Sequence, residues 1–255
     1  MSLIALLFDV DGTLAETERD GHRVAFNQAF AEAGLDWEWS VDLYGELLAI
    51  TGGKERMRHY LQAHRPDEFK ERSESGELDS LIPRLHQAKT RFYTELLSHG
   101  DIPLRPGVER LFHEAMSAGI RLAIATTTTP ANVTALLTHT LGKESIGWFD
   151  IIAAGDIVPA KKPAPDIYDY ALKERQWDAA NCIAFEDSEN GIQSSHGANL
   201  TTIITVNDYT REHDFSGAHI VLEHLGEPGN KPKVYAGDLG QYECVDLEYL
   251  KEITG

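Results

Sequence analysis

Residues 3–13 read Leu-Ile-Ala-Leu-Leu-Phe-Asp-Val-Asp-Gly-Thr, an apolar run that ends in the two carboxylates Asp9 and Asp11. Six consecutive apolar residues predict a strand that is buried on both faces, as in a parallel sheet. Being two residues apart, the carboxylates would leave a regular strand on the same face. Because close carboxylates repel each other, the pair predicts a divalent cation with oxygen ligands, and Mg²⁺ is the simplest choice. By itself, Asp-x-Asp-Gly is equally typical of a turn.

The charge balance excludes two classes of partner. The 255 residues carry 23 basic and 41 acidic side chains, which gives a formal net charge of −18 at pH 7. Binding to nucleic acid or to an anionic membrane requires the opposite balance, so we expect neither partner. An acidic chain still binds a phosphorylated metabolite if a few cations and backbone N–H groups build the site locally. We therefore expect a small phosphorylated molecule as the partner.

The cysteine content and the N-terminus favour a cytoplasmic protein. Cys182 and Cys244 are the two cysteines of the chain, and they form no Cys-x-x-Cys pattern, as is typical of a reducing compartment. The N-terminal apolar run is too short for a secretory leader, and no stretch of the sequence is long enough to span a bilayer. For the oligomeric state, which the sequence does not reveal, we expect a monomer or a weak homo-oligomer.

Short apolar runs alternate with helical patterns from residue 105 onward. The runs cover residues 121–125, 149–153, 182–185, 202–206 and 219–222. The helical patterns cover residues 107–118, 130–141, 165–176 and 188–198. This alternation predicts an α/β fold with a doubly wound, Rossmann-like parallel sheet. In such a sheet, ligands bind at the carboxyl ends of the strands.

The segment between the first strand and residue 102 shows helical patterns alone. One apolar stripe comprises Val24, Phe26, Ala29, Phe30 and Ala33, and a later one comprises Leu85, Ala88, Phe92 and Leu96. Residues 66–76 are polar and predict a surface loop. We therefore expect an α/β core domain over residues 1–17 and 102–225, a helical cap domain over residues 18–101, and a C-terminal extension of uncertain structure over residues 226–255.

Three further predicted strands end in polar residues. Residues 126–129 are four threonines before Pro130, and hydroxyls beside the N–H groups of a helix start suit a phosphate. Residues 161–166 read Lys-Lys-Pro-Ala-Pro-Asp, in which the prolines could direct a lysine at a phosphate, although paired lysines are more often solvated. Residues 186–188 read Glu-Asp-Ser, a second acidic pair that also suits a helix N-cap.

Taken in order, these four motifs resemble those of the haloacid dehalogenase superfamily, over residues 1–18 and about 105–218. The helical insert and residues 162–168 are similar to the branch that contains β-phosphoglucomutase and phosphoglycolate phosphatase. A narrower resemblance to the CbbY-type phosphatases rests on residues 15–18, 21–23 and 51–56 and on the threonines. That group is associated with the Calvin cycle and removes xylulose-1,5-bisphosphate.

The resemblance implies a Mg²⁺-dependent sugar-phosphate phosphatase that acts through an aspartyl-phosphate. Asp9 would be the nucleophile and Asp11 the general acid and base, while Thr126 and Lys162 would neutralise the phosphate. The implied metal ligands are Asp9, Asp11 through its backbone carbonyl, and Asp187. Glu186 would be either a direct ligand or a residue that contacts one of the ligands. The implied substrate contacts are Glu18, His22, Gly52, Gly53, Lys54, Glu55 and Arg56 in the cap, and Thr127 and Thr128 in the core.

Three alternatives stay open at this point. Without the family resemblance, residues 52–56 are more simply a loop that enters a helix, with Lys54 and Arg56 solvated. A phosphoglycolate phosphatase or a phosphomutase would share the four motifs, but mutases of this branch carry a lysine in the loop that here reads Thr126 to Thr129 and then Pro130. A receiver-like phospho-acceptor domain, the non-enzymatic alternative, is smaller and has no large helical insert.

Overall fold

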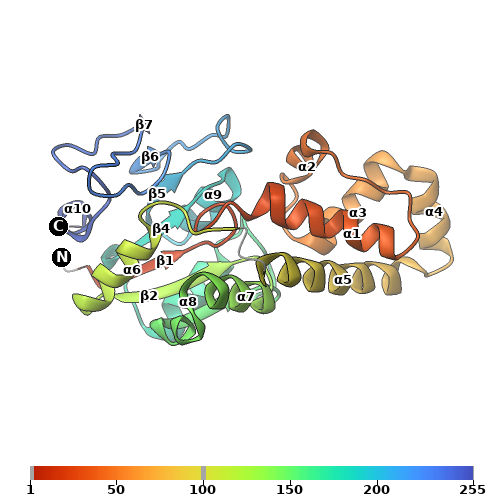
Figure 1. The fold of residues 1–255 in the computed structure, drawn as a ribbon, viewed down its shortest axis with the longest axis horizontal. Coiled ribbons are helices and arrows are strands. Elements are labelled where there is room, and N and C mark those ends of the chain that lie inside the picture. The colour runs from red at the N-terminus through yellow and green to blue at the C-terminus, as the bar shows by residue number, and fades with distance from the viewer. Residues whose placement is uncertain (1–2, 99–101, 255) are drawn as a thin grey trace. The chain divides into compact units, whose positions relative to one another are not determined.

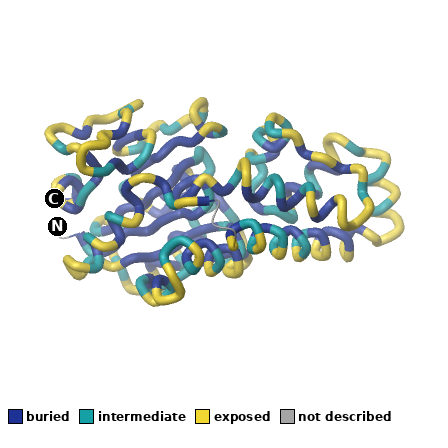
Figure 2. The backbone as a smooth tube through the Cα atoms, viewed as in Figure 1, coloured by how far each residue is buried: buried dark blue, intermediate teal, exposed yellow. Residues whose placement is uncertain are grey.

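The chain forms two compact units in the computed structural model, which describes residues 3–98 and 102–254 (Figure 1). Unit 1 comprises residues 1–16 and 103–255, and unit 2 comprises residues 17–102. Each unit buries apolar side chains of its own, and most strand residues of unit 1 are buried (Figure 2).

Unit 1 is built on a sheet of seven strands among the described residues. The strands are β1 (Ala5–Phe8), β2 (Arg121–Thr126), β3 (Phe149–Ala154), β4 (Cys182–Glu186), β5 (Thr201–Thr205), β6 (Ile220–Leu222) and β7 (Val234–Ala236). They lie in the order β3-β2-β1-β4-β5-β6-β7, with parallel pairing up to β6 and antiparallel pairing between β6 and β7. The predicted parallel sheet is confirmed. The strand order reverses at β1, where ligands bind in sheets of this kind.

Helices cover both faces of this sheet. Successive side chains of a strand point to opposite faces, so neighbouring residues of β1 contact different helices. Leu7 of β1 belongs to a buried cluster with Ala171 of α8 (Asp166–Arg175). The next residue, Phe8, contacts Phe112 of α6 (Val108–Ser117), with ring centroids 5.0 Å apart. The other helices of unit 1 are α7 (Pro130–Leu141), α9 (Glu189–Gly197) and α10 (Leu247–Ile253), with short 3-10 helices η2 (Lys143–Trp148) and η3 (Ala179–Asn181).

Residues 226–254, whose structure is uncertain from the sequence, are part of unit 1. They supply β7 and α10. Arg110 of α6 donates hydrogen bonds to the carbonyls of Gly226 (2.9 Å) and Val245 (3.1 Å). The Glu227 carboxylate accepts from the Gly107 N–H at 2.8 Å. These bonds attach the extension to the start of α6.

Every regular element among the described residues of unit 2 is a helix. Its elements are the π-helix η1 (Glu18–His22), α1 (Arg23–Glu32), α2 (Val41–Leu47), α3 (Gly53–His64), α4 (Pro66–Glu74) and α5 (Leu78–Ser98). Phe26, Ala29 and Phe30 of α1 are buried as the stripe predicts, whereas Ala33 is exposed. The Phe26 and Phe30 rings pack on Trp39, with ring centroids 4.6 and 5.0 Å away.

The predicted stripe on α5 is wrong by one residue after Leu85. The buried side chains are Lys89, Tyr93 and Leu97, not Ala88, Phe92 and Leu96, which are half-buried. A lysine within the buried face hides the true periodicity. The Lys89 ammonium is stabilised there by aromatic rings, because it lies 5.1 Å from the Phe26 centroid and 5.0 Å from the Tyr93 centroid.

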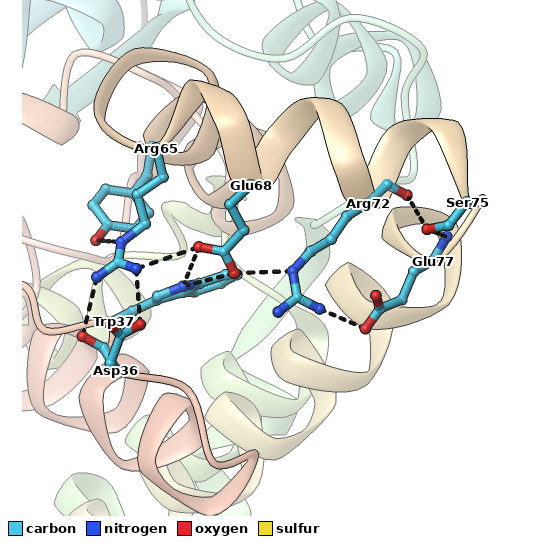
Figure 3. A network of polar contacts seen from close by, with 8 residues as sticks. Asp36, Trp37, Arg65, Glu68, Arg72, Ser75 and Glu77 are labelled. Carbon is cyan, nitrogen blue, oxygen red and sulfur yellow. Dashed lines mark hydrogen bonds and ion pairs between the residues drawn. The ribbon is translucent and has the colours of Figure 1, made fainter.

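The surface loop predicted at residues 66–76 is also wrong, because residues 66–74 form α4. This helix begins at Pro66 and buries none of its side chains, so it shows no apolar stripe. Polar contacts hold it instead (Figure 3). Glu68 pairs with Arg65 at 3.3 Å and with Arg72 at 2.9 Å, and it accepts a hydrogen bond from Trp37 Nε1 at 3.1 Å.

Two further sequence expectations concern location. Within residues 3–98 and 102–254, no helix combines the length and the apolar character that a membrane span needs. Cys182 and Cys244 are both buried and form no disulfide.

Candidate active site

One carboxylate of the first acidic pair, Asp9, meets the second pair, Glu186 and Asp187, at the carboxyl edge of the sheet in unit 1. Phe8 pairs with Phe185 across β1 and β4, so the residues that follow them, Asp9 and Glu186, lie side by side. Asp9, Glu186 and Asp187 each place a carboxylate oxygen within 4.8 Å of the others. The parallel register therefore joins residues that are almost 180 positions apart.

The loop after β1 turns at Gly12. This residue has φ +80°, and a Cβ there would lie 2.2 Å from Asp187 Oδ2 and 2.6 Å from Asn207 Nδ2. Only glycine fits both the backbone conformation and this close approach. Asp11 is half-buried in the same turn and forms a backbone bridge with Ala15. The turn that the sequence predicts at Gly12 thus also lets the loop after β1 approach Asp187 closely.

Lys162 brings a positive charge into the acidic cluster. Its side chain is 5% exposed, and its ammonium donates hydrogen bonds to Asp9 Oδ1 at 2.7 Å and to Glu186 Oε1 at 2.6 Å. The neighbouring Lys161 instead pairs with Asp156, whose side chain is exposed, at 3.0 Å. The two adjacent lysines therefore have different environments, and only Lys162 is directed at the carboxylates.

Tyr168 supports this arrangement and has no role in the sequence prediction. It is fully buried in α8, and its hydroxyl donates to Glu186 Oε1 at 2.5 Å. The Lys162 ammonium also lies 5.2 Å from the centroid of the Tyr168 ring. Two donors thus occupy Oε1 of Glu186, while Oε2 faces Gly191, where a Cβ would be only 2.0 Å away. Glu186 is therefore engaged in holding Lys162.

Burial controls the protonation of these groups. It raises the pKa of Asp9 to about 7, an increase that the Lys162 ammonium partly offsets and the Glu186 carboxylate enlarges. Burial opposes the charge of Lys162, but the carboxylates of Asp9 and Glu186 raise its pKa above the ordinary value. Burial and the Glu186 carboxylate also raise the pKa of Tyr168, so its hydroxyl stays protonated and can donate.

The cluster fits a divalent cation. Three buried carboxylates place oxygens within 4.8 Å of one another and the Lys162 ammonium contacts two of them, so negative charge is concentrated in a desolvated place. Asp187 is oriented by Asn207, whose Nδ2 donates to Asp187 Oδ2 at 2.6 Å. Asp9 and Asp187 are thus the carboxylates best placed to bind a hard cation such as Mg²⁺, with Glu186 turned toward Lys162. The side chain of Asp11 does not belong to this cluster among the described residues.

The threonine loop follows β2 at the same edge of the sheet. Thr126 is buried, and its Oγ1 accepts a hydrogen bond from the Thr128 N–H at 3.3 Å. The Thr128 hydroxyl accepts from Asn132 Nδ2 at 2.9 Å, and Thr129 caps α7 by accepting from the Asn132 N–H. Thr127 is half-buried. The loop is therefore tied to the start of α7.

The predicted cap residues lie at the start of unit 2 and around the start of α3. Arg56 is buried, and its guanidinium donates to the Leu47 carbonyl at 3.1 Å and to the Tyr44 hydroxyl at 3.0 Å. The Tyr44 hydroxyl in turn donates to the Glu18 carboxylate. The structure thus connects Glu18 to Arg56 through Tyr44, and it rules out the simpler interpretation of a solvated Arg56.

The remaining cap residues have distinct environments. Gly52, with φ +96°, is the N-cap of α3, and a Cβ on Gly53 would lie 2.9 Å from the His86 ring. Lys54 is half-buried and Glu55 is exposed.

His22 forms a second polar pair that the sequence analysis missed. Its Nδ1 lies 2.7 Å from the ammonium of Lys89, and both side chains are buried. The sequence feature that could have identified Lys89 is its position, because it lies four residues after the buried Leu85 and therefore on the same face of α5.

Comparisons with known proteins agree with the geometry of unit 1. Residues 5–199 match the family model of the haloacid dehalogenase-like hydrolases. The protein CbbY of Rhodobacter capsulatus is 50% identical over 218 residues, which cover 86% of this chain and 92% of that protein. The plasmid-encoded CbbY of Cupriavidus necator is 46% identical over 224 residues, which cover 88% and 86%.

A solved structure extends this similarity to the fold. It is a crystal structure of a CbbY variant from Rhodobacter sphaeroides in complex with xylulose-1,5-bisphosphate. It superposes with a TM-score of 0.79 at 44% identity, and the match covers 89% of this chain and 96% of that one.

Proposed function

Because this chain belongs to the haloacid dehalogenase-like hydrolase family and is a phosphatase of that family, we propose that it hydrolyses a sugar bisphosphate with Mg²⁺ as cofactor. Xylulose-1,5-bisphosphate is the first candidate, since a similar protein has been crystallised with it. The observation that carries the proposal is the contact of Asp9 with Lys162 at 2.7 Å beside Glu186 and Asp187.

Asp9 is the nucleophile in this proposal. Lys162 donates to its Oδ1, so we assign the attack on phosphorus to Oδ2. A bond forms between Oδ2 and phosphorus, and the bond between phosphorus and the sugar oxygen breaks. Asp11 donates a proton to the departing sugar oxygen. The products of this step are a free hydroxyl on the sugar and a phosphoryl group carried by Asp9.

Water completes the reaction. Asp11, now a carboxylate, removes a proton from a water molecule, whose oxygen attacks phosphorus. The bond between phosphorus and Asp9 breaks, which returns Asp9 as a carboxylate and releases inorganic phosphate. During both steps, Lys162 offsets the negative charge of the phosphoryl oxygens and the Thr126 hydroxyl donates a hydrogen bond to them.

A cation held by Asp9, Asp187 and the Asp11 carbonyl would reduce the repulsion between the carboxylate and the phosphate dianion. Asn207 keeps Asp187 in place for this task through its 2.6 Å hydrogen bond. Glu186 keeps Lys162 in place at 2.6 Å.

In the same proposal, residues 1–17 and 102–225 form the catalytic core and residues 18–101 form the cap, which recognises the rest of the sugar. We assign the second phosphate to the start of α3, where Gly52, Gly53, Lys54, Glu55 and Arg56 lie. Glu18 and His22 would contact the sugar, and Thr127 and Thr128 would lie beside the transferred phosphate. The buried guanidinium of Arg56 supports this assignment, because a cation excluded from water binds an anion more strongly than a solvated one.

Phosphate release from a panel of sugar mono- and bisphosphates tests the proposal. With Mg²⁺ present, we expect a kcat/KM for xylulose-1,5-bisphosphate about tenfold or more above that for monophosphates such as 2-phosphoglycolate. Chelation of Mg²⁺ should stop the reaction.

The other outcomes are equally informative. A preference for a monophosphate would contradict the substrate and leave the phosphatase in place. Transfer of phosphate between sugar positions without release would show a mutase. Stoichiometric labelling without turnover would show a phospho-acceptor domain.

A further inference from the structure

Arg105 lies in unit 1 just after the chain returns from unit 2, and the proposed mechanism gives it no task. Its residue is 8% exposed. Its guanidinium donates hydrogen bonds to the backbone carbonyls of Gly12, Thr205 (3.2 Å), Val206 (2.6 Å) and Glu223 (2.5 Å). These carbonyls belong to the loop after β1, to the end of β5 and to the residue after β6.

The backbone of Arg105 is bound to the same loop. Its N–H donates to the Leu14 carbonyl at 2.8 Å, and the preceding residue, Leu104, forms a backbone bridge with Ala15. The guanidinium Nε also pairs with Glu16 at 3.2 Å. The segments that leave and re-enter unit 1 are therefore joined to each other through Arg105.

The Gly12 carbonyl is a sensitive place for such a bond. Gly12 directly follows Asp11, and it leaves no room for a Cβ between itself and Asp187. A displacement of Gly12 would therefore move the Asp9–Asp11 turn against the second acidic pair. Errors of about 1 Å at a catalytic group lower rates by about 10²-fold.

The chemistry of the contact requires arginine. A guanidinium presents five N–H donors in a fixed plane, whereas a lysine ammonium is a compact charge on a flexible stem. The carbonyls come from three separate segments, so a single ammonium at the end of a lysine could not reach all of them in the same geometry. The acid that pairs with Arg105, Glu16, is mostly exposed, with 58% of its side chain accessible.

We propose that Arg105 is a positioning residue that sets the backbone of the Asp11–Gly12 turn against the ends of β5 and β6. The catalytic part of this inference, that the position of the turn affects the reaction rate, rests on the proposed function. Its structural part, the immobilisation of residues 9–16, does not depend on that function.

Arg110 provides a matched control within the same unit. Its guanidinium also donates to two backbone carbonyls, those of Gly226 and Val245, and it pairs with carboxylates. These partners belong to the C-terminal extension and to α6. The variants Arg105→Lys and Arg110→Lys thus make the same chemical change, but only the first touches the catalytic loop.

We expect Arg105→Lys to lower kcat by about tenfold to 10²-fold with KM changed less than about threefold, because the turn is misplaced while the substrate contacts remain. Arg110→Lys should keep kcat within about twofold of the wild type. Amide hydrogen exchange gives the second readout. The peptide covering residues 9–16 should exchange faster in Arg105→Lys and unchanged in Arg110→Lys, where residues 226–246 should respond instead.

The outcomes separate the inference from the proposed function. Wild-type exchange in residues 9–16 together with wild-type kcat in Arg105→Lys would overturn the inference. A wild-type protein without phosphatase activity would contradict the proposed function, while faster exchange in residues 9–16 would still support the positioning of the turn. Arg105→Gln covers the case in which the lysine variant does not fold, and loss of a cooperative thermal transition in both would make Arg105 a folding residue and overturn the inference.

Discussion

The molecule contains two ion-pair networks, one with a cation between two anions and one with an anion between two cations, and they differ in how far they are exposed to solvent. In unit 1, the cation Lys162 lies between the anions Asp9 and Glu186, and all three residues are buried. In unit 2, the anion Glu68 lies between the cations Arg65 and Arg72, and each of these side chains is more than 20% exposed (Figure 3). We name them the buried network and the surface network.

The surroundings decide what each network can do. Water screens the surface network, so each of its ion pairs contributes at most about 1 kcal/mol to stability. Its role is local, because α4 buries no side chain of its own. The buried network carries a desolvation cost that its contacts only partly offset. A group of charges that is this costly to bury points to chemistry and not to stability, since perturbed pKa values concentrate at functional sites.

The largest effect is expected from Asp9→Asn. The amide is a far weaker nucleophile than the carboxylate, so kcat should fall by at least about 10⁴-fold. The fold should survive, because burial already favours an uncharged group at this position, as the raised pKa of Asp9 shows. Steady-state phosphate release and a thermal melt measure the two effects. Turnover above a trace in a folded variant would remove Asp9 from the mechanism.

The second prediction compares adjacent lysines. Lys162→Met removes the one cation in contact with two buried carboxylates, so it should cost about 3–5 kcal/mol of stability and about 10²–10³-fold in kcat. Lys161→Met breaks the pair with Asp156, whose side chain is 58% exposed, so both properties should stay close to wild type. Urea unfolding and kinetics on the two variants test this contrast. Equal effects of the two substitutions would mean that burial does not distinguish them.

The third prediction uses pH. The pKa of Asp9 rises from 3.8 to about 7 in the folded, metal-free protein, so the stability gained from its neutral form is present at low pH and is lost as pH approaches 7. A cation needs the carboxylate and competes with this proton. The rise in Tm on adding Mg²⁺ should therefore be larger at about pH 8 than at about pH 5.5.

The matched control for this pH dependence is Glu68→Gln. It alters the surface network and leaves Asp9 unchanged, so its Mg²⁺ response should follow that of the wild type. A Mg²⁺ response that is the same at both pH values in the wild-type protein would show that Asp9 does not bind the cation.

The sequence predicted the sheet and the residues at its edge for a common reason. Parallel strands place their carboxyl ends together, so polar motifs after separate strands converge without any knowledge of side-chain contacts. Asp9 and Glu186 are brought together by strand register alone. The partners that fix these residues have no such signal. Tyr168, Asn207 and Arg105 act through contacts that form only in the packed structure.

The helical unit was harder to predict because charge replaces apolar pattern there. Helix α4 is held by the surface network, and hydrophobic periodicity does not register ion pairs. On α5, Lys89 occupies a buried position between aromatic rings, so the apolar stripe is misassigned by one residue. The two errors have one cause, because charged side chains in both helices make contacts that apolar periodicity does not register.

The fourth prediction concerns Arg56 in unit 2. Arg56→Lys removes a planar guanidinium that donates to both Leu47 and Tyr44. If Arg56 recognises the second phosphate, KM for a sugar bisphosphate should rise about tenfold or more while kinetics on a monophosphate stay unchanged. The control is Arg58→Lys on the same helix, since Arg58 pairs with the exposed Asp79. Equal changes for mono- and bisphosphates would assign Arg56 to packing of unit 2.

The smallest effect is expected at the centre of the surface network. Glu68→Gln keeps the side-chain volume and removes the charge shared by Arg65 and Arg72, so unit 2 should lose about 1 kcal/mol of stability and the protein should keep its activity. Because exposed charges are screened within about 3 Å at 1 M salt, this loss should shrink as salt is added, whereas that of Lys162→Met should persist. Glu71→Gln, on the exposed side of the same helix, is the control and should change neither property. If salt does not reduce the loss of stability caused by Glu68→Gln, the two networks differ less in solvation than their exposed fractions indicate. The functional role of the buried network would then rest on the kinetics of the Asp9 and Lys162 variants alone.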